Sequence, residues 1–169
     1  MSRSTLLIRT TREEDWQAVR ALRLEMLRDT PLAYAETLEH ALQVEEPAWR
    51  LRARRGETAG QTSVVAIEGA RWVGHMGGYL PDAATGPVLV AVYVAPDRRG
   101  DQAGVARALL DEVERWARQF GSTLRLEVHE ENPRARRFYE KLGFTLTGRS
   151  RRYELEPGGL ELEMIKPLA

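Results

Sequence analysis

The feature that most constrains this sequence is a buried strand that runs directly into an amphipathic helix. Residues 87–96 (PVLVAVYVAP) are nearly all β-branched or apolar, which is typical of a strand covered on both faces. Residues 103–121 then place apolar side chains at helical spacing, and Gly121 stands where a helix end is expected. Two arginines and two glycines join these segments, so backbone N–H groups converge at the positive end of a helix dipole. The junction therefore suits an anion.

Two common phosphate-binding loops do not fit this junction. A Walker-type loop requires a Lys-Ser or Lys-Thr pair, and none occurs near Gly100 or Gly104. A dinucleotide-binding fingerprint requires three glycines, and this loop has two, four positions apart. Arg98 and Arg99 add positive charge beside the turn. A plain strand-to-helix turn with two solvated arginines is the alternative to an anion site.

The composition limits the classes of function. At 169 residues we expect one domain spanning residues 1–169. Lys plus Arg and Asp plus Glu are 25 each, so no net charge directs the chain to nucleic acid or to a membrane surface. The chain has no cysteine, which removes disulfides, thiolate metal sites and a cysteine nucleophile. Its three histidines lie far apart, so we expect no metal site. No signal-peptide or membrane-spanning pattern is present, and we expect a cytoplasmic protein.

Hydrophobic periodicity predicts the order of elements β-α-α-β-β-β-α-β-α-β-β. A capping box of Thr11 and Glu14 predicts the start of the first helix, which should end before Pro31. Pro47 interrupts the second helical region, giving a kinked helix or two short ones. Three glycines in the strand at 72–80 indicate a bulge or a close approach. This order implies a mixed α/β fold with helices on both faces of the sheet. The remaining strands are expected at 5–9, 63–67, 123–129, 144–155 and 160–168, and the last helix at 132–143.

Two motifs in this chain resemble those of the GCN5-related N-acetyltransferase (GNAT) family. In the first, a strand ending V-x-P runs into an R-G-x-G-x-[GA] loop and a helix continuing LL. The second is a strand followed by Asn, then a helix with Ala and an aromatic-Tyr pair, then GF. The matching residues are Val94, Pro96, Arg99, Gly100, Gly104, Ala106, Leu109 and Leu110 in the first motif, and Asn132, Ala135, Tyr139, Gly143 and Phe144 in the second.

The resemblance spans nearly the whole chain and implies a fold and an activity. The fold is the three-layer acyl-CoA N-acyltransferase fold, with a central mixed, mostly antiparallel sheet and helices on both faces. The activity is transfer of an acetyl group from acetyl-CoA to a primary amine, by direct attack in a ternary complex. Acetyl-CoA is then a co-substrate, and no metal is required. A non-catalytic domain that binds or senses acyl-CoA is the main alternative, and a structural domain without a ligand is a third.

The resemblance also implies the residues that contact acetyl-CoA. It assigns this role to Tyr93, Val94, Arg99, Gly100, Asp101, Gln102, Ala103, Gly104, Val105, Ala106, Asn132 and Tyr139. The loop between Gly100 and Gly104 is about two residues longer than the family pattern, and Asp101 replaces its usual Arg or Gln. Because an acid would repel a pyrophosphate, we expect Asp101 to face solvent or to cap the helix. Arg98 and Arg99 would then supply the charge.

Val94 is the candidate donor of a backbone N–H to the thioester carbonyl, provided that the strand at 123–129 diverges from it. Alternation in that strand separates Leu124, Leu126 and Val128 from Arg125, Glu127 and His129. A carboxylate in a central strand needs water, a partner or a substrate.

Glu127 therefore has two interpretations. It is a general base acting through water, as the resemblance to ribosomal-protein N-terminal acetyltransferases implies, or it forms a salt bridge to Arg125 or to an arginine of the last helices. His129 is a second candidate base. Tyr139 matches the tyrosine that protonates the departing thiolate in the family, with half-buried packing as its alternative. Asn132 would cap the last helix and lie near the pantetheine.

The amine acceptor is left open. In this fold the first helices and the final hairpin wall the acceptor side. A peptide N-terminus, a lysine, a polyamine and a drug-like amine all fit, and the sequence leaves open whether two copies form a homodimer. The candidate acceptor-side residues are Tyr34, Glu36, Glu39, Glu45, Glu46 and Trp49 from the first region and Arg151, Arg152 and Tyr153 from the second.

Overall fold

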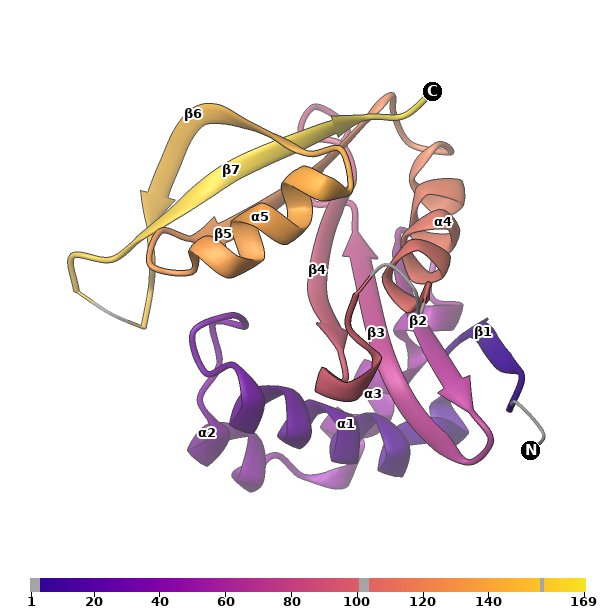
Figure 1. Ribbon diagram of the computed structural model, residues 1–169. Coiled ribbons are helices and arrows are strands. Elements are labelled where there is room, and N and C mark those ends of the chain that lie inside the picture. The colour runs from indigo at the N-terminus through magenta and orange to yellow at the C-terminus, as the bar shows by residue number, and fades with distance from the viewer. Residues whose placement is uncertain (1–3, 101–103, 156) are drawn as a thin grey trace.

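The structure is a computed structural model that describes residues 4–100, 104–155 and 157–169 (Figure 1). The described strands form a seven-stranded sheet in the order β1-β2-β3-β4-β5-β7-β6. β4 and β5 pair in parallel and the other neighbouring strands pair antiparallel, so the predicted mixed, mostly antiparallel sheet is confirmed. The strands are β1 (Leu6–Thr10), β2 (Gln61–Glu68), β3 (Arg71–Tyr79), β4 (Val88–Val94), β5 (Thr123–His129), β6 (Thr145–Arg152) and β7 (Leu160–Pro167).

Helices cover both faces of this sheet, as predicted. α1, α2 and α3 lie on one face, and α4 and α5 on the other (Figure 1). The second helical region forms two short helices that separate just before Pro47, which lies in the first turn of α3. α4 ends before the predicted stop at Gly121. The helices are α1 (Trp16–Asp29), α2 (Leu38–Gln43), α3 (Glu46–Ala53), α4 (Val105–Ala117) and α5 (Pro133–Lys141), with 3₁₀ turns at Glu13–Asp15, Arg54–Glu57 and Pro96–Arg98.

The predicted cap of the first helix is wrong by one residue. The Asp15 carboxylate, not Glu14, accepts the backbone N–H of Arg12 at 2.8 Å, and a 3₁₀ turn precedes α1. The Thr11 hydroxyl is buried and donates to the carbonyl oxygen of Ala53 at 2.7 Å. A tertiary contact across 42 residues therefore takes the hydroxyl that local pattern assigned to a cap.

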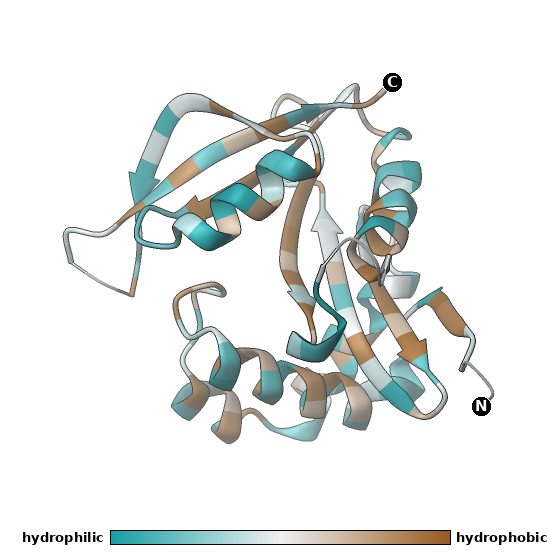
Figure 2. Cartoon of the chain, viewed as in Figure 1, coloured by the Kyte–Doolittle hydropathy of each residue, from teal (hydrophilic) through white to brown (hydrophobic). Residues whose placement is uncertain are grey.

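The apolar core lies on both faces of the central strands, and Figure 2 shows β2 and β4 as largely hydrophobic. α4 packs against β2 and β3, with Leu109, Leu110 and Val113 fully buried. A second cluster, formed by Leu24, Leu27, Ala41 and Trp49, joins α1, α2 and α3. No helix in the described part of the chain is both long enough and apolar enough to cross a membrane.

The glycines of β3 account for both predicted effects, a bulge and a close approach. The register between β2 and β3 shifts between Ala66 and Ile67, where β3 has one extra residue next to Gly74. A Cβ at Gly78 would lie 2.7 Å from the Trp116 ring of α4, and one at Gly74 would lie 3.1 Å from the carbonyl oxygen of Tyr93. Side chains at these positions would push the helix and the neighbouring strand away from β3.

β4 departs from the prediction of a strand covered on both faces. Its two ends are buried, but Val90 in its middle is 37% exposed, and Ala91 and Val92 are only half-buried. The reason is the neighbouring strand, because β5 stays close to β4 only at the start of the pair. The exposed middle of β4 is where the candidate site is built.

Candidate active site

The site begins where β4 and β5 diverge. The two strands share one paired position, Val88 with Arg125, beside a hydrogen bond from the Arg125 N–H to the Pro87 carbonyl at 3.1 Å. Beyond this position the register provides no further pair, so the backbone of β4 is left without a neighbouring strand on this side. The divergence that the sequence analysis required is present. It leaves an edge of β4 able to pair with an extended ligand.

A bulge re-aims the backbone of β4 at this edge. Ala91 has a φ of 51°, which is rare for a residue with a side chain. Its carbonyl oxygen lies 2.7 Å from Nδ1 of His75, and Nε2 of His75 lies 2.8 Å from the Ser63 hydroxyl. A carbonyl only accepts, so Nδ1 carries the proton, and the Ser63 hydroxyl donates to Nε2. Burial lowers the pKa of His75 to about 4, which keeps the ring neutral at pH 7.

The N–H group of Val94 points away from β3. Val94 faces Gly74, and the next N–H, that of Ala95, donates to Val73 at 2.8 Å. Val94 therefore occupies a position whose backbone groups face the divergence. Val92 lies two residues earlier, and its carbonyl accepts the Tyr34 hydroxyl at 2.8 Å. Sequence reasoning missed Val92, since a uniform apolar run does not reveal where a bulge lies.

Tyr93 points the other way, into the core. Its side chain is 3% exposed and its hydroxyl donates to Glu25 at 2.8 Å, while burial raises its pKa. The guanidinium of Arg99 stacks over its ring at 5.7 Å. Tyr93 thus supports the loop that follows β4, and only its backbone lies on the exposed strand.

Both arginines of the glycine loop are engaged within the protein. Arg98 forms ion pairs with Glu68 at 2.6 Å and with Asp97 at 3.1 Å. Arg99 forms an ion pair with Asp29 at 2.5 Å and donates to the Val94 carbonyl at 2.8 Å. These carboxylates largely neutralise the charge of Arg98 and Arg99.

The loop itself is described only at its two ends. Gly100 has a φ of 104° and Gly104, the N-cap of α4, has a φ of 68°, so both need glycine. Val105 is buried and directs its side chain toward β3, and Ala106 is half-buried. The candidates Asp101, Gln102 and Ala103 lie outside the described residues.

α5 presents Tyr139 beside this edge. Asn132 caps the helix as predicted, accepting the Ala135 N–H at 3.1 Å. The Tyr139 ring packs at its edge against Phe138 and Phe144, with centroids 5.4 and 5.9 Å away. Burial raises its pKa, and no hydrogen bond of its hydroxyl is found within residues 4–100, 104–155 and 157–169. Tyr139 also contributes to the raised pKa of Tyr34, so the two hydroxyls are electrostatic neighbours.

Glu127 lies on the opposite face of β5 from α5, within a cluster of charges. Arg151 of β6 forms ion pairs with Glu127 at 2.5 Å and with Glu161 at 3.1 Å. Glu163, the register partner of Glu127 on β7, instead pairs with Arg125 at 3.1 Å. Burial and the Glu161 carboxyl group raise the pKa of Glu127 to about 7, against the opposing effect of Arg151.

The salt bridge considered for Glu127 is therefore formed with Arg151 of β6, and not with Arg125 or an arginine of the last helices. A base interpretation is equally compatible with the pKa of Glu127, because a pKa of about 7 suits proton transfer at neutral pH. His129, the weaker candidate base, is 5% exposed, and its Nδ1 accepts the Glu131 N–H at 3.1 Å in the following turn.

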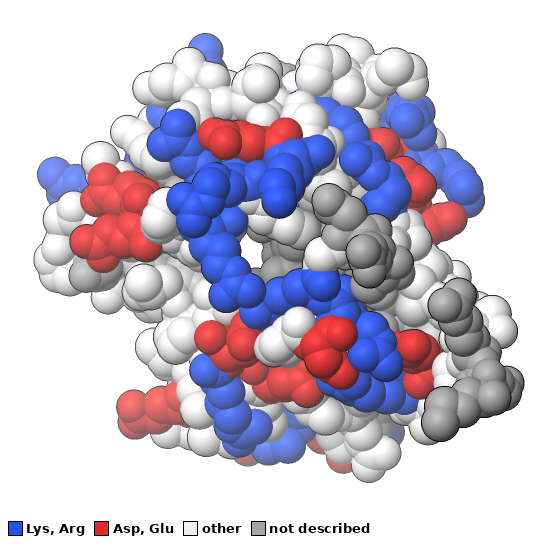
Figure 3. Space-filling model, viewed as in Figure 1, with Lys and Arg blue, Asp and Glu red and all other residues white. Residues whose placement is uncertain are grey.

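Positive charge surrounds the divergence on the face shown in Figure 3. Lys and Arg side chains lie on both sides of a hollow between the α5 half and the α1 half of this face. α5 contributes the exposed Arg134, Arg136 and Arg137. Burial raises the pKa of Asp29 on α1, but hydrogen bonds from Arg99 and Thr30 and the charges of Arg99 and Arg134 lower it overall. Such a rim attracts a polyanionic ligand.

The first helices and the final hairpin do approach each other, as expected for the acceptor side. A cavity of about 580 Å³ lies between them, lined by Leu32 and Leu38 on one side and Tyr153 and Leu155 on the other. Trp49 does not reach a surface, because it is 1% exposed and its Nε1 donates to Val44. The remaining candidates of this side, Glu39, Glu45, Glu46, Arg151 and Arg152, are exposed.

Glu36 does not serve as an open carboxylate. It accepts hydrogen bonds from Arg23 at 2.8 Å and from both terminal nitrogens of Arg52 at 3.1 and 2.8 Å. His40 approaches it at 2.8 Å. Although burial opposes ionisation, these donors lower the pKa of Glu36 to about 2. Glu36 therefore stays ionised and holds two arginines in place.

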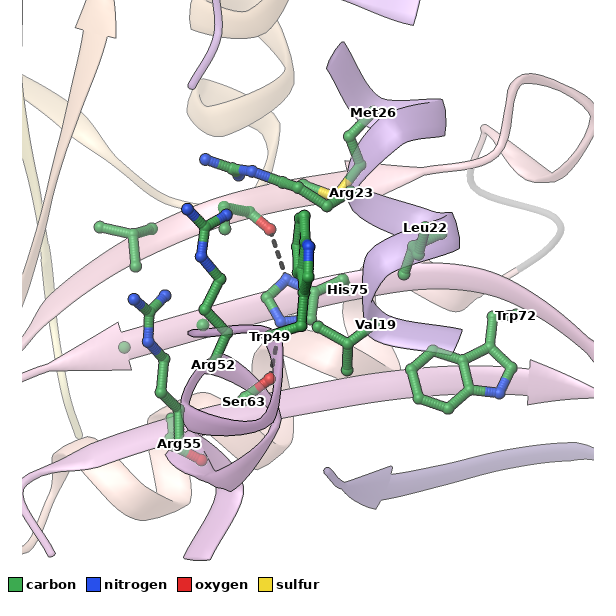
Figure 4. A pocket seen from close by; sticks show the side chains of 15 residues that line it. Val19, Leu22, Arg23, Met26, Trp49, Arg52, Arg55, Ser63, Trp72 and His75 are labelled. Carbon is green, nitrogen blue, oxygen red and sulfur yellow. Dashed lines mark hydrogen bonds between the residues drawn. The ribbon is translucent and has the colours of Figure 1, made fainter. Parts of the chain in front are cut away.

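A smaller cavity of about 70 Å³ lies behind the middle of β4, between the sheet and helices α1 and α3 (Figure 4). We call it the arginine cavity, because Arg23, Arg52 and Arg55 line it together with His75 and Val90. In Figure 4 the three guanidinium groups lie in a row on one side of the pocket. Sequence reasoning missed this group, since its members come from separate elements and show no shared motif.

The comparisons with known proteins agree with this architecture. The family model described as "Acetyltransferase (GNAT) family" matches residues 17–144. No match was found among curated proteins. Three of the similar solved structures show the fold in relatives of 19–24% identity.

The first of these structures is an acetyltransferase of the GNAT family from Streptococcus pneumoniae, with 19% identity, a TM-score of 0.77 and coverage of 98% of this chain and 100% of that one. The second is ribosomal-protein-alanine N-acetyltransferase from Brucella melitensis, with 24% identity, a TM-score of 0.75 and coverage of 96% of this chain and 99% of that one. The third is phosphinothricin acetyltransferase from Sinorhizobium meliloti in complex with acetyl-CoA, with 20% identity, a TM-score of 0.74 and coverage of 98% of this chain and 89% of that one. With a family model that covers most of the chain, this protein belongs to the GNAT family of acetyltransferases.

Proposed function

We propose that the chain acts as a single domain that transfers the acetyl group of acetyl-CoA to a primary amine of a small molecule or peptide. The observation that carries the proposal is the position of Tyr139, a hydroxyl without a described hydrogen bond beside a strand edge that no neighbouring strand covers. A catalyst needs such a donor for the leaving group, whereas a domain that only binds acyl-CoA does not.

The residues around the divergence fit acetyl-CoA as co-substrate. The open edge of β4 can pair with the amides of the pantetheine arm. The glycine loop and the N-terminus of α4 offer backbone N–H groups to the pyrophosphate. The arginines of α5 add positive charge for the remaining phosphate. Asn132, which caps α5, lies at the start of the same helix as Tyr139.

The transfer proceeds in one ternary complex. The neutral amine attacks the thioester carbon, and the carbonyl oxygen gains negative charge that the N–H group of Val94 stabilises. The bond from carbon to sulfur breaks, and the Tyr139 hydroxyl donates its proton to the departing thiolate. Glu127, acting through water, takes the proton that the attacking amine loses. No acyl-enzyme forms.

A thiol-release assay with acetyl-CoA and a panel of amines tests this proposal. We expect release of CoA with at least one amine, and we expect it to depend on Tyr139 and Glu127. Calorimetry with acetyl-CoA runs beside the assay. Tight binding of acetyl-CoA without thiol release for any amine would instead support the non-catalytic alternative.

A further inference from the structure

The arginine cavity carries more positive charge than the protein balances. None of the residues that line it within the described part of the chain is an Asp or a Glu. Glu36 lies outside the lining and forms ion pairs with Arg23 and Arg52, so one carboxylate faces two guanidinium groups. The Arg55 side chain forms no hydrogen bond or ion pair with any described residue, whereas its backbone carbonyl accepts the Thr58 N–H. Three cations and one anion leave a formal excess of two positive charges.

The neighbouring charges act on Arg55 even though its side chain reaches solvent. Partial desolvation and the charges of Arg52 and Arg23 lower the pKa of Arg55, and Glu36 compensates only in part. His75, in the floor of the cavity, has both ring nitrogens engaged and is neutral, so it supplies no negative charge. An anion between these groups would lower the electrostatic free energy of the whole cluster.

The cavity lies on the same face of the sheet as Glu127. A Cβ at Gly77 would contact both His75 and Val90, so these side chains share the face that α1 and α3 cover. Val88 pairs with Arg125 in parallel register, so Val90 and Glu127, each two residues further along, have side chains on the same face of the sheet. Arg125 and Glu127 both project to the face opposite Leu126. Val90 therefore lies between the arginine cavity and the carboxylates of β5 and β7.

This order of charges sets a distance. Gly77, Val90 and Glu127 lie on three successive strands, and paired strands are about 4.8 Å apart. Because β5 diverges from β4 beyond Val88, the distance between the cavity and Glu127 is more than two such spacings, or more than about 10 Å. The cavity of about 70 Å³ has room for a group of a few heavy atoms, because one water molecule needs about 10–15 Å³ of cavity volume. An amine that carries a small anion a few bonds away would span this distance.

We propose that the arginine cavity is the carboxylate-binding subsite for the acceptor, which is an amino acid or a similar amine bearing a carboxylate. A guanidinium group matches the two oxygens of a carboxylate in a fork geometry, and the Arg55 side chain is free of described partners for this contact. The amine of the acceptor then lies toward Glu127 and the exposed middle of β4. This inference rests on the proposed transfer to an amine and adds the class of acceptor.

The test uses acceptors in matched pairs, one member with a carboxylate and the other with a carboxamide: glycine, β-alanine and 4-aminobutanoate, each against its amide. For at least one pair we expect kcat/KM to favour the carboxylate about tenfold or more, which corresponds to a single charged hydrogen bond. Arg55→Gln should remove this preference through KM of the carboxylate, and leave the amide within about twofold. The carboxylate and the amide of a pair differ in the pKa of their amine, but this difference is the same for the unmodified protein and for Arg55→Gln at one pH. It therefore cancels when the preferences of the two proteins are compared.

Arg54→Gln is the matched control. Arg54 is the neighbouring arginine of the same 3₁₀ turn and is exposed like Arg55, but it pairs with Glu13 at 3.6 Å and does not line the cavity. The Arg54→Gln substitution removes one positive charge from the same segment as Arg55→Gln does. It should leave the preference for the carboxylate over the amide unchanged. Equal rates for both members of every pair, or an equal loss for both members in Arg55→Gln, would overturn the inference.

Calorimetry with propionate at constant ionic strength separates this inference from the proposed function. We expect propionate to bind the unmodified protein and the Arg54→Gln variant, and to lose binding in Arg55→Gln. If propionate binds through Arg55 but no amine is acetylated, the subsite stands and the proposed function fails. If amines are acetylated but propionate does not bind and the pairs react alike, the function stands and the subsite is wrong.

Discussion

Nδ1 of His75 donates to the carbonyl oxygen of Ala91 at 2.7 Å and thereby fixes the one strained residue of β4. The contact joins two neighbouring strands at the point where the register between them shifts. Since Ala91 is followed directly by Val92, its conformation decides where the outward-facing N–H groups of β4 point. His75 is thus a positioning residue for the site, although its ring does not lie at the divergence itself.

Replacement of His75 tests this role. His75→Leu removes the donor and leaves the Ala91 carbonyl unpaired, which should cost about 1–3 kcal/mol of stability. Turnover should fall about 10- to 100-fold, because misplaced N–H groups no longer meet the thioester oxygen. His75→Asn is the matched variant, since its side-chain amide can donate from nearly the same place and should restore most of the turnover. If the Leu and Asn variants lose stability equally but keep full turnover, His75 serves stability alone.

The same histidine predicts a pH dependence of stability. The pKa of His75 is about 4 in the folded protein, below its ordinary value of 6.5, so between these values the unfolded chain binds a proton that the folded protein does not. Stability should therefore be complete above about pH 6.5 and fall as the pH drops toward 4, by at most about 3 kcal/mol.

Glu127 acts in the opposite direction in an overlapping range. Its pKa is raised from 4.5 to about 7, so the folded protein binds the extra proton between these values and loses stability as the pH rises. The difference in unfolding free energy between the unmodified protein and His75→Asn, measured by urea titration from pH 4 to pH 8, isolates the histidine. A difference that does not change with pH would contradict the lowered pKa of His75.

Much of this architecture follows from local sequence signals. The order of strands and helices, the cap at Asn132 and the end of α1 before Pro31 were all predicted, because each depends on a few neighbouring residues. The cap at Thr11 was predicted wrongly, since its hydroxyl bonds to Ala53 from a different helix. Periodicity alone could not anticipate this contact.

The parts of the site that sequence reasoning missed depend on tertiary partners. The sequence suggested that Arg98 and Arg99 are free charges. In the structure Glu68 pairs with Arg98 and Asp29 pairs with Arg99, and each of these carboxylates is at least 30 residues away in the sequence. The bulge at Ala91 lies within an unbroken apolar run and depends on His75 of the neighbouring strand. The arginine cavity likewise forms only when α1 and α3 pack side by side on the sheet.

The glycine loop should bind phosphate through its backbone. Gly104→Ala strains a residue with a φ of 68°, and Gly104→Asp adds to this strain a negative charge at the N-terminus of α4. We expect calorimetric affinity for CoA to fall in the order Arg98→Ala, Gly104→Ala, Gly104→Asp, with the last variant weakest by at least about tenfold relative to Gly104→Ala. If Arg98→Ala weakens CoA binding most, the loop acts through its side-chain charge.

Glu127 should control the dependence of rate on pH. With a pKa of about 7 the carboxylate is half ionised near neutrality, so kcat should rise as the pH increases through 7 and then level off. Glu127→Gln should lower kcat about 10²–10⁴-fold, flatten this rise and leave acetyl-CoA affinity nearly unchanged. Glu163→Gln is the comparison variant: it removes a neighbouring carboxylate that pairs with Arg125 and helps to raise the pKa of Glu127, so it should move the rise in kcat to lower pH without abolishing it. Equal losses of stability and activity in Glu127→Gln would identify a structural ion pair with Arg151.

Tyr139→Phe tests the proton donor. The substitution keeps the ring contacts with Phe138 and Phe144 and removes a hydroxyl that has no described hydrogen bond, so folding and acetyl-CoA affinity should be preserved. The interaction with the thiolate forms mainly in the transition state, so kcat should fall about 10²–10⁴-fold with little change in KM. A thioester with a more acidic leaving thiol should recover part of this loss, because its thiolate needs the proton less.

Tyr34→Phe provides the contrast for Tyr139. The Tyr34 hydroxyl neighbours Tyr139 but donates to the Val92 carbonyl at 2.8 Å, so its removal should disturb the strand rather than the departing sulfur. We expect a loss of activity in Tyr34→Phe that is the same for good and poor leaving thiols. The ratio of the two rates therefore distinguishes proton donation from positioning. If Tyr139→Phe keeps full turnover with a poor leaving thiol, the proton comes from another group or the thiolate leaves unassisted.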